Sequence, residues 1–226
     1  MRVKEIAHGL VLAAPTLGYV RSPGIHASDL YGAFYKAFDP QRYDKRDKQG
    51  EPIPMDLAKL ELGTSFEEVL EPALAQRLLG SRPGEFTATH SQDCTRNTQP
   101  YAPSNVCVEC GAGVLFSPDY LFDDPNGDLV LGEFKLTWYS SKGAPFEPKF
   151  AKYFTQIKLY LYWLGLVKAR LYILFANSDY KPPTPSLRCW ELSFTRRELV
   201  DEHNVIMRHA RKKGLLVATS AETDSD

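Results

Sequence analysis

The chain has 226 residues, of which 43% are hydrophobic and 12% aromatic, so it can bury a substantial core and lacks the composition of a disordered chain. No apolar run reaches the length needed to span a membrane, and four cysteines in so long a chain do not indicate a disulfide framework. The formal net charge of −1 neither indicates nor excludes a nucleic-acid partner, because such binding requires a basic patch rather than a basic total.

The N-terminal stretch MRVKEIAHGLVLAAPTLGYV faintly resembles a secretory signal peptide. Glu5, His8 and Pro15 interrupt its apolar run, and no clean cleavage site follows. We therefore expect no signal peptide and an intracellular, reducing location.

The first helix is expected over residues 26–38, with Ser28 or Asp29 as its N-cap. Its apolar residues share one face, and they are Leu30, Phe34, Ala37 and Phe38. The charged stretch that follows, residues 39–54, has no periodicity and contains glycine and prolines. We expect it to be an exposed loop.

A second helix is predicted over residues 63–80, where Ser65 and Glu68 form a capping box. Pro72 lies inside this helical pattern, so we expect a kink or a break there. Residues 81–105 are rich in Thr, Asn, Pro and Ser, which is typical of loops.

From residue 106 the pattern changes to alternation with β-branched and aromatic residues, which is typical of strands. The strand predicted over residues 129–140 is apolar almost throughout, as expected for a central strand covered on both faces. A long aromatic helix over residues 148–166 then crosses to the next strand. The other elements expected are two strands within residues 106–122, a turn at 123–128, and strands at 169–177 and 187–194.

The last helix is expected to begin with a Thr195–Glu198 capping box and to end at Gly214. Residues 217–226 are small and acidic, which indicates a disordered tail. This order of elements predicts an α/β fold, with a central mixed β-sheet flanked by helices, in a single domain of residues 1–216.

The acidic stretch SPDYLFDDPNGDLVLGEFK contains the most informative residues of the chain. In a hairpin, Asp119 would lie near the start of the turn, while Glu133 and Lys135 would point to the same face of the returning strand. Two carboxylates converging in a partly buried site repel each other unless a cation lies between them. Oxygen ligands favour Mg²⁺ or Mn²⁺, and a nearby lysine can orient a water or neutralise developing charge.

The alternative is a surface hairpin whose acids are solvated, and this stretch alone leaves both interpretations open. Asp123, Asp124 and Asp128 are expected to be turn residues rather than metal ligands.

The spacing Pro118-Asp119…Glu133-Phe134-Lys135 resembles the signature of the PD-(D/E)XK nuclease superfamily. The segment GTSFE, with Glu67, resembles the upstream helix motif of its exonuclease branch. The segment QIKLY, with Gln156 and Tyr160, resembles the motif of its RecB-like and lambda-exonuclease-like members, of phage type. The resemblance covers about residues 63–177, and its motifs occur in the family's order.

The resemblance implies a restriction-endonuclease-like core and metal-dependent hydrolysis of DNA. Carried over by position, Asp119 and Glu133 are metal ligands, joined by the backbone carbonyl of Phe134. Glu67 is an additional carboxylate ligand or orients water at the metal, and Lys135 positions the attacking water. Gln156 and Tyr160 contact the DNA backbone or orient Lys135; the alternative for both is helix surface and core packing.

The function indicated is an exonuclease acting in DNA recombination, repair or replication, in the cytoplasm of a bacterium or, if virus-encoded, of the host. The alternatives are a structure-specific endonuclease, a CRISPR-associated-type spacer-processing nuclease, or a non-catalytic DNA-binding module. Besides DNA, expected partners are a recombinase or a single-strand annealing protein and further copies of the chain, but no membrane.

DNA binding requires positive charge beyond this site. The candidates lie on the predicted crossover helix, in the early loop and at the end of the last helix. They are Lys149, Lys152 and Lys158, then Arg42, Lys45, Arg46 and Lys48, then Arg208, Arg211, Lys212 and Lys213.

The cysteines suggest a second metal site, because His90, Cys94, Cys107 and Cys110 could together bind zinc. The alternative is that Cys107 and Cys110 are small apolar strand residues and that Cys189 belongs to the core. Some RecB-like nucleases carry an iron–sulfur cluster on one early and three late cysteines. Only Cys189 is late here, so we do not expect a cluster.

Overall fold

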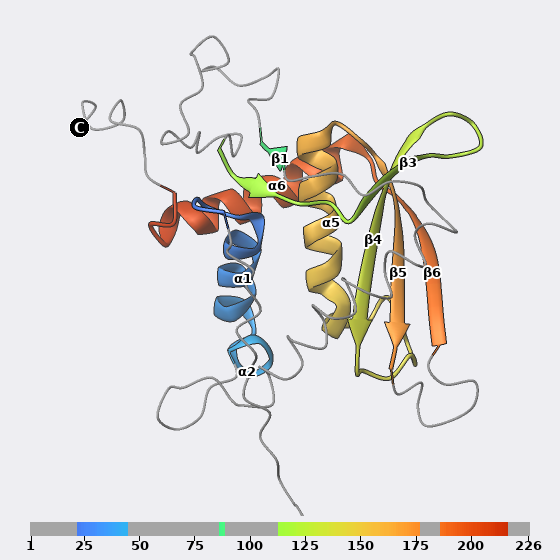
Figure 1. The fold of residues 1–226 in the computed structure, drawn as a ribbon. Helices are drawn as coiled ribbons and strands as arrows, with labels where there is room; N and C mark the ends of the chain where they lie inside the picture. Colours follow the sequence, from blue (N-terminus) through green and yellow to red (C-terminus); the bar gives the residue numbers. More distant parts are fainter. Residues whose placement is uncertain (1–21, 45–85, 89–112, 177–185, 217–226) are drawn as a thin grey trace, which may run out of the picture.

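The computed structural model describes residues 22–44, 86–88, 113–176 and 186–216. A four-stranded sheet with the order β3-β4-β5-β6 forms its centre (Figure 1). The outer pairs β3–β4 and β5–β6 are antiparallel, and the central pair β4–β5 is parallel. The strands span Tyr120–Asp123, Leu129–Thr137, Lys168–Phe175 and Ser186–Ser193. The predicted α/β fold with a mixed sheet is confirmed.

The parallel pair β4–β5 is joined by a helical crossover, as parallel strands require. A short 3-10 helix, η2 (Pro148–Phe150), leads into α5 (Ala151–Leu164). Gly165 ends α5 in the left-handed conformation at φ 72°, which glycine adopts without steric penalty. The aromatic helix predicted from the sequence is therefore present almost to its expected ends.

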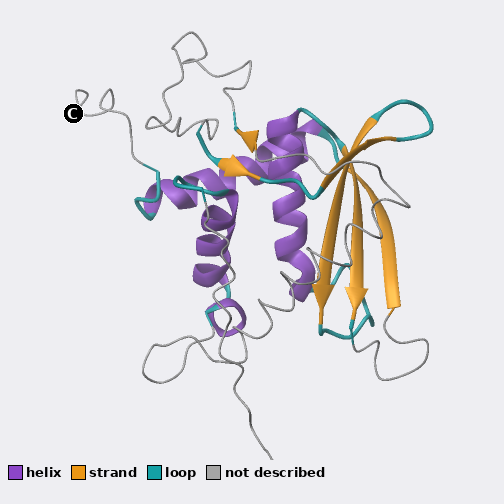
Figure 2. Ribbon diagram, viewed as in Figure 1, coloured by secondary structure: helices purple, strands orange, loops and turns teal. Residues whose placement is uncertain are grey.

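Three helices gather on one side of the sheet (Figure 2). They are α1 (Ala27–Phe38), α5 and α6 (Arg196–Lys212), and α6 packs against both of the others. The predicted Thr195–Glu198 capping box is present, and Gly214 follows the last turn with φ 66°. None of the described helices is long and apolar enough to cross a membrane.

The predicted N-cap of α1 was wrong, and one residue of its apolar face is exposed. The N-cap of α1 is His26, whose backbone N–H donates to the Asp29 carboxylate at 2.9 Å, rather than Ser28 or Asp29. Phe38 is 75% exposed, because α1 buries Tyr31 and Tyr35 together with Leu30 and not the far end of its apolar stripe.

The stretch read as loop from residue 39 contains a short helix, α2 (Pro40–Tyr43). Asp39 caps it by accepting from the backbone of Arg42, and the proline stands at its start, where no N–H is needed. Two short strands, β1 (Phe86–Thr87) and β2 (Leu115–Phe116), pair in an antiparallel sheet of their own.

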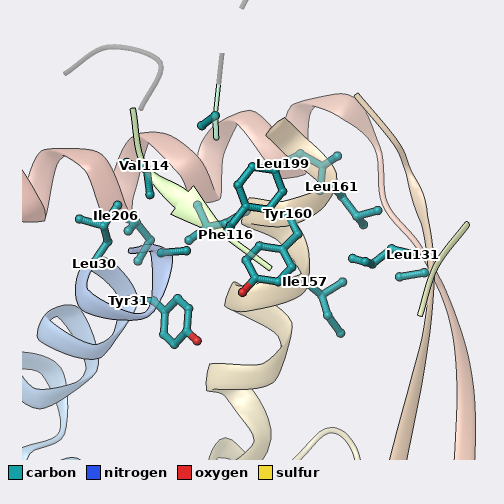
Figure 3. Close-up of a cluster of buried hydrophobic side chains, with 14 of the residues drawn as sticks. Leu30, Tyr31, Val114, Phe116, Leu131, Ile157, Tyr160, Leu161, Leu199 and Ile206 are labelled. Atoms are coloured by element: carbon teal, nitrogen blue, oxygen red, sulfur yellow. The ribbon is translucent and has the colours of Figure 1, made fainter. Parts of the chain in front are cut away.

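The main core lies between the sheet and the helices (Figure 3). Alternation along the strands sends Leu131 of β4 and Leu171 of β5 toward α5, which contributes Ile157 and Leu161. The residues that alternate with these along the strands face the opposite side of the sheet. Three of them form a second cluster, Tyr120, Phe134 and Tyr172. The two central strands are thus buried on both faces, as their apolar sequences predicted.

Several expectations concern segments outside the described residues. They are the helix over residues 63–80 with its kink at Pro72, the tail over 217–226, and the loop over 81–105 except for residues 86–88, where the short strand β1 lies.

Candidate active site

The candidate site forms where β3 begins beside the middle of β4. Tyr120 pairs with Gly132, so Asp119, one residue earlier, lies beside Glu133. The backbone N–H of Phe134 donates to Oδ2 of Asp119 at 2.8 Å and fixes this carboxylate. Strand pairing therefore brings together two carboxylates that are far apart in sequence.

The position of Asp119 in the hairpin differs from expectation. The turn lies at residues 124–127, and Asp123 at the end of β3 pairs with Leu129. Asp119 therefore lies at the open end of the hairpin, away from the turn, and not near the start of the turn as expected. It approaches Glu133 because the antiparallel register places the beginning of β3 opposite the middle of β4.

Lys135 links the two carboxylates. Alternation along β4 places its side chain on the same face as Glu133. Its Nζ donates to Oε2 of Glu133 at 2.8 Å and to Oδ2 of Asp119 at 3.4 Å. Only 16% of the Lys135 side chain is exposed, so the ammonium acts in a partly desolvated setting.

The helix α5 supplies the next layer of the site. Gln156 donates its amide N–H groups to Oε2 of Glu133 at 3.1 Å and to the hydroxyl of Tyr160 at 3.3 Å. Burial is the largest cause that raises the pKa of Tyr160, so this hydroxyl keeps its proton. The structure thus connects Gln156 to the carboxylate Glu133, whereas the sequence suggested DNA or Lys135 as its partner.

The ionised form of Glu133 is disfavoured by its surroundings. Its side chain is fully buried, and burial followed by repulsion from Asp119 raises its pKa to about 8. Burial alone would lower the pKa of Lys135, but the charges of Asp119 and Glu133 outweigh it and raise that pKa well above its ordinary value. Lys135 is therefore the cation that partly compensates the two acids.

The donor set fits a hard divalent cation. Oε1 of Glu133 is buried without a hydrogen-bond partner. Both bonds to Asp119 go to Oδ2, and none to Oδ1 is found among the described residues. A buried carboxylate oxygen that lacks a donor is unusual and calls for an explanation, and a cation bound between the two acids is one.

Of the predicted site residues, the structure brings together Asp119, Glu133, Lys135, Gln156 and Tyr160. Glu67 lies outside the described residues, as do the zinc candidates His90, Cys94, Cys107 and Cys110. Within the described ranges, no group of three or more His, Cys, Asp or Glu side chains is arranged to hold a metal ion. A third carboxylate ligand stays a prediction.

Of the three acids expected in the turn, Asp124 and Asp128 lie there, whereas Asp123 is the last residue of β3. Asp124 accepts from the backbone N–H groups of Asn126 and Asp128, at 2.8 and 3.0 Å, and closes the turn. Lys168 of β5 forms ion pairs with Asp124 and Asp128.

Cys189 was wrongly placed in the core. It is exposed, because it lies on β6, the strand at the edge of the sheet.

Comparisons with known proteins yield only distant likenesses. No family model and no curated protein matches the sequence. The crystal structure of SSO0001 is similar over 85% of this chain and 80% of its own, with 14% identity and a TM-score of 0.47. An alkaline exonuclease from Laribacter hongkongensis, LHK-Exo, is similar over 85% of this chain and 93% of its own, with 16% identity and a TM-score of 0.41.

The complex of LHK-Exo with dAMP gives 15% identity and a TM-score of 0.40 over the same shares of the two chains. These likenesses are too distant to carry a functional argument, so the proposal below rests on the geometry of the site and on the sequence motifs.

Proposed function

We propose that the chain is a divalent-metal-dependent nuclease that hydrolyses DNA phosphodiester bonds, and that it acts as an exonuclease. One observation carries the proposal. Asp119 and Glu133 are buried side by side, Lys135 bridges them, and Oε1 of Glu133 has no hydrogen-bond partner. A purely structural ion pair would satisfy its buried oxygens, because leaving one unsatisfied costs about 1–3 kcal/mol.

Asp119 and Glu133 would hold the cation, with the Phe134 carbonyl and Glu67 as further proposed ligands. Mg²⁺ or Mn²⁺ bound there would polarise the phosphodiester and favour ionisation of the attacking water. The N–H group of Phe134 fixes Asp119, and Gln156 fixes Glu133. The acids are thereby held in place before substrate arrives, which is what pre-organised catalysis requires.

Lys135 is the proposed group that positions the attacking water and offsets negative charge developing on the phosphate. Its ammonium lies within hydrogen-bond reach of both acids, so it borders the place where the reacting phosphate would lie. The pKa raised by its acidic neighbours keeps it protonated. It would therefore act as a hydrogen-bond donor and a positive charge rather than as a base.

Exonuclease action is proposed over endonuclease action because of two sequence features. The helix acid Glu67 and the pair Gln156 and Tyr160 accompany exonucleases in the superfamily that the sequence resembles. An endonuclease is the alternative that the experiment must separate.

The test is digestion of one plasmid in two forms, end-labelled linear DNA and covalently closed circles, with Mg²⁺, Mn²⁺ or EDTA. We expect the linear form to be degraded with either metal, the circles to be spared, and EDTA to stop the reaction. Cleavage of closed circles at a comparable rate would assign an endonuclease instead. Cleavage that persists in EDTA, or no cleavage with either metal, would refute the proposed function.

A further inference from the structure

The three lysines predicted to contact DNA from the crossover segment have different surroundings. Lys149 forms an ion pair with Glu147 at 2.8 Å, and Lys158 forms one with Glu202 at 2.9 Å. Among the described residues, no carboxylate lies within ion-pair distance of Lys152. Two of the three charges are therefore compensated within the protein, and one is not.

The surroundings of Lys152 are cationic and aromatic. Its Nζ lies 5.4 Å from the centre of the Tyr31 ring, on the helix α1. Burial, and then the charges of Lys36 and Lys135, lower the pKa of Lys152. Among the described residues, the charges that act on Lys152 in this way are thus also positive, and one of them is the lysine of the candidate active site.

Lys152 also lies on the same face of α5 as a residue of the candidate site. It precedes Gln156 by one helical turn on α5, so the two side chains lie along the same face. Tyr31, on α1, lies beneath the ammonium of Lys152. Figure 3 shows the Tyr31 and Tyr160 hydroxyls turned toward each other between α1 and α5.

We propose that Lys152 binds a backbone phosphate of the DNA strand held in the active site, next to the phosphate that is cleaved. The proposal rests on the proposed nuclease function and deepens it. An anion is the ligand that this place would attract, because Lys36 adds its positive charge to that of Lys152 and no described carboxylate pairs with Lys152. A lysine ammonium binds phosphate as a point charge and needs no fixed geometry.

The probe is a set of short oligonucleotides, each with one uncharged methylphosphonate linkage at a different position. Binding is measured in Ca²⁺, and single-turnover cleavage in Mg²⁺. The test variant is Lys152→Met, which keeps an apolar stem over Tyr31 and removes the charge. Lys168→Gln is the control, because it removes a lysine outside the predicted DNA contacts whose charge is paired with Asp124 and Asp128.

We expect Lys152→Met to weaken binding of unmodified DNA by about tenfold, with a salt dependence shallower by about one phosphate contact. The rate at saturating DNA should change by less than about threefold, since the contact is made before and during the reaction alike. Lys152→Arg should restore binding. One methylphosphonate position should weaken binding to the unmutated protein and to Lys168→Gln, yet leave Lys152→Met unaffected.

Equal affinities and identical methylphosphonate profiles for the unmutated protein and Lys152→Met would overturn the inference. So would a lowered melting temperature with unchanged binding by the folded protein, which would make Lys152 a packing residue. The proposed function fails separately, through absence of metal-dependent cleavage by the unmutated protein. Because binding is measured in Ca²⁺, the Lys152 comparison does not depend on that result.

Discussion

Both faces of strand β4 are buried, but only one of them carries charged side chains. Phe134 is 2% exposed and stacks on Tyr172 with ring centres 4.5 Å apart. Glu133, the preceding residue, is fully buried on the other face, beside Asp119 and Lys135. Burial of Phe134 stabilises the fold by about 1.5–3 kcal/mol, whereas burial of a carboxylate destabilises it unless the charge is compensated.

This difference indicates that the face with Phe134 only stabilises the fold. An aromatic cluster needs no further partner to be stable, and Tyr120 completes it by packing edge-on against Phe134. The acidic face has one lysine, one side-chain amide and one backbone N–H for two carboxylates, and one buried oxygen is left unsatisfied. The proposed cation would account for this arrangement.

The largest expected effect tests that contrast directly. Glu133→Ala, and separately Asp119→Ala, should reduce cleavage below detection, because either change removes half of the proposed metal-binding pair. Phe134→Leu is the matched control on the opposite face. It should lower the melting temperature, because it removes a stacked aromatic ring, while the folded fraction keeps its activity.

Cleavage is measured with metal supplied, and folding by circular dichroism on the same preparations. Robust cleavage by either alanine variant would remove the two acids from the active site.

A second prediction concerns stability and pH in the metal-free protein. The pKa of Glu133 rises from 4.5 in the unfolded chain to about 8 in the folded protein. Between these pH values the folded protein retains a proton on Glu133 that the unfolded chain has released. The contribution of this bound proton to the free energy of unfolding is therefore complete below pH 4.5 and falls as the pH rises to about 8. With EDTA present, the melting temperature should therefore drop by several degrees across this range.

Glu133→Gln is the control, because its amide cannot titrate and should remove this part of the pH dependence. Mg²⁺ should raise the melting temperature of the unmutated protein most at high pH, where the carboxylate is ionised. Parallel melting curves for Glu133→Gln and the unmutated protein across the range would contradict the burial argument.

The contrast between the faces also shows what local sequence could predict. The hydrophobic runs of β4 and β5, the crossover helix and the capping box of α6 are local signals, and all were predicted. The pairing of Glu133 with Lys135 follows from alternation along one strand.

The remainder depends on tertiary packing. The place of Asp119 depends on the register between β3 and β4, and the contact of Gln156 with Glu133 on how the crossover helix lies over the sheet. The exposure of Phe38 and the pairing of Lys158 with Glu202 on α6 are likewise set by tertiary packing. A single sequence does not specify these distances.

A third and smaller effect is expected at Lys135. Lys135→Ala should lower the single-turnover rate by at least about a hundredfold, the usual scale for removing one group of this kind. DNA affinity in Ca²⁺ should change little, because phosphate contacts elsewhere carry most of the binding. A large loss of melting temperature with near-normal chemistry would show instead that Lys135 only holds the two acids together.

The smallest effect is expected at Gln156, whose amide holds Oε2 of Glu133 and reaches the Tyr160 hydroxyl. Gln156→Ala frees the carboxylate to turn, so about tenfold more Mg²⁺ should be needed for half-maximal cleavage, as is typical when a partner of a metal ligand is lost. Tyr160→Phe is the control: it keeps the buried ring against Phe116 and removes only the acceptor of the second amide bond, so the Mg²⁺ requirement should rise by less than about threefold. If Gln156→Ala instead leaves the Mg²⁺ requirement unchanged and weakens DNA binding in Ca²⁺, then Gln156 contacts the substrate, and the bond to Glu133 does not orient a metal ligand.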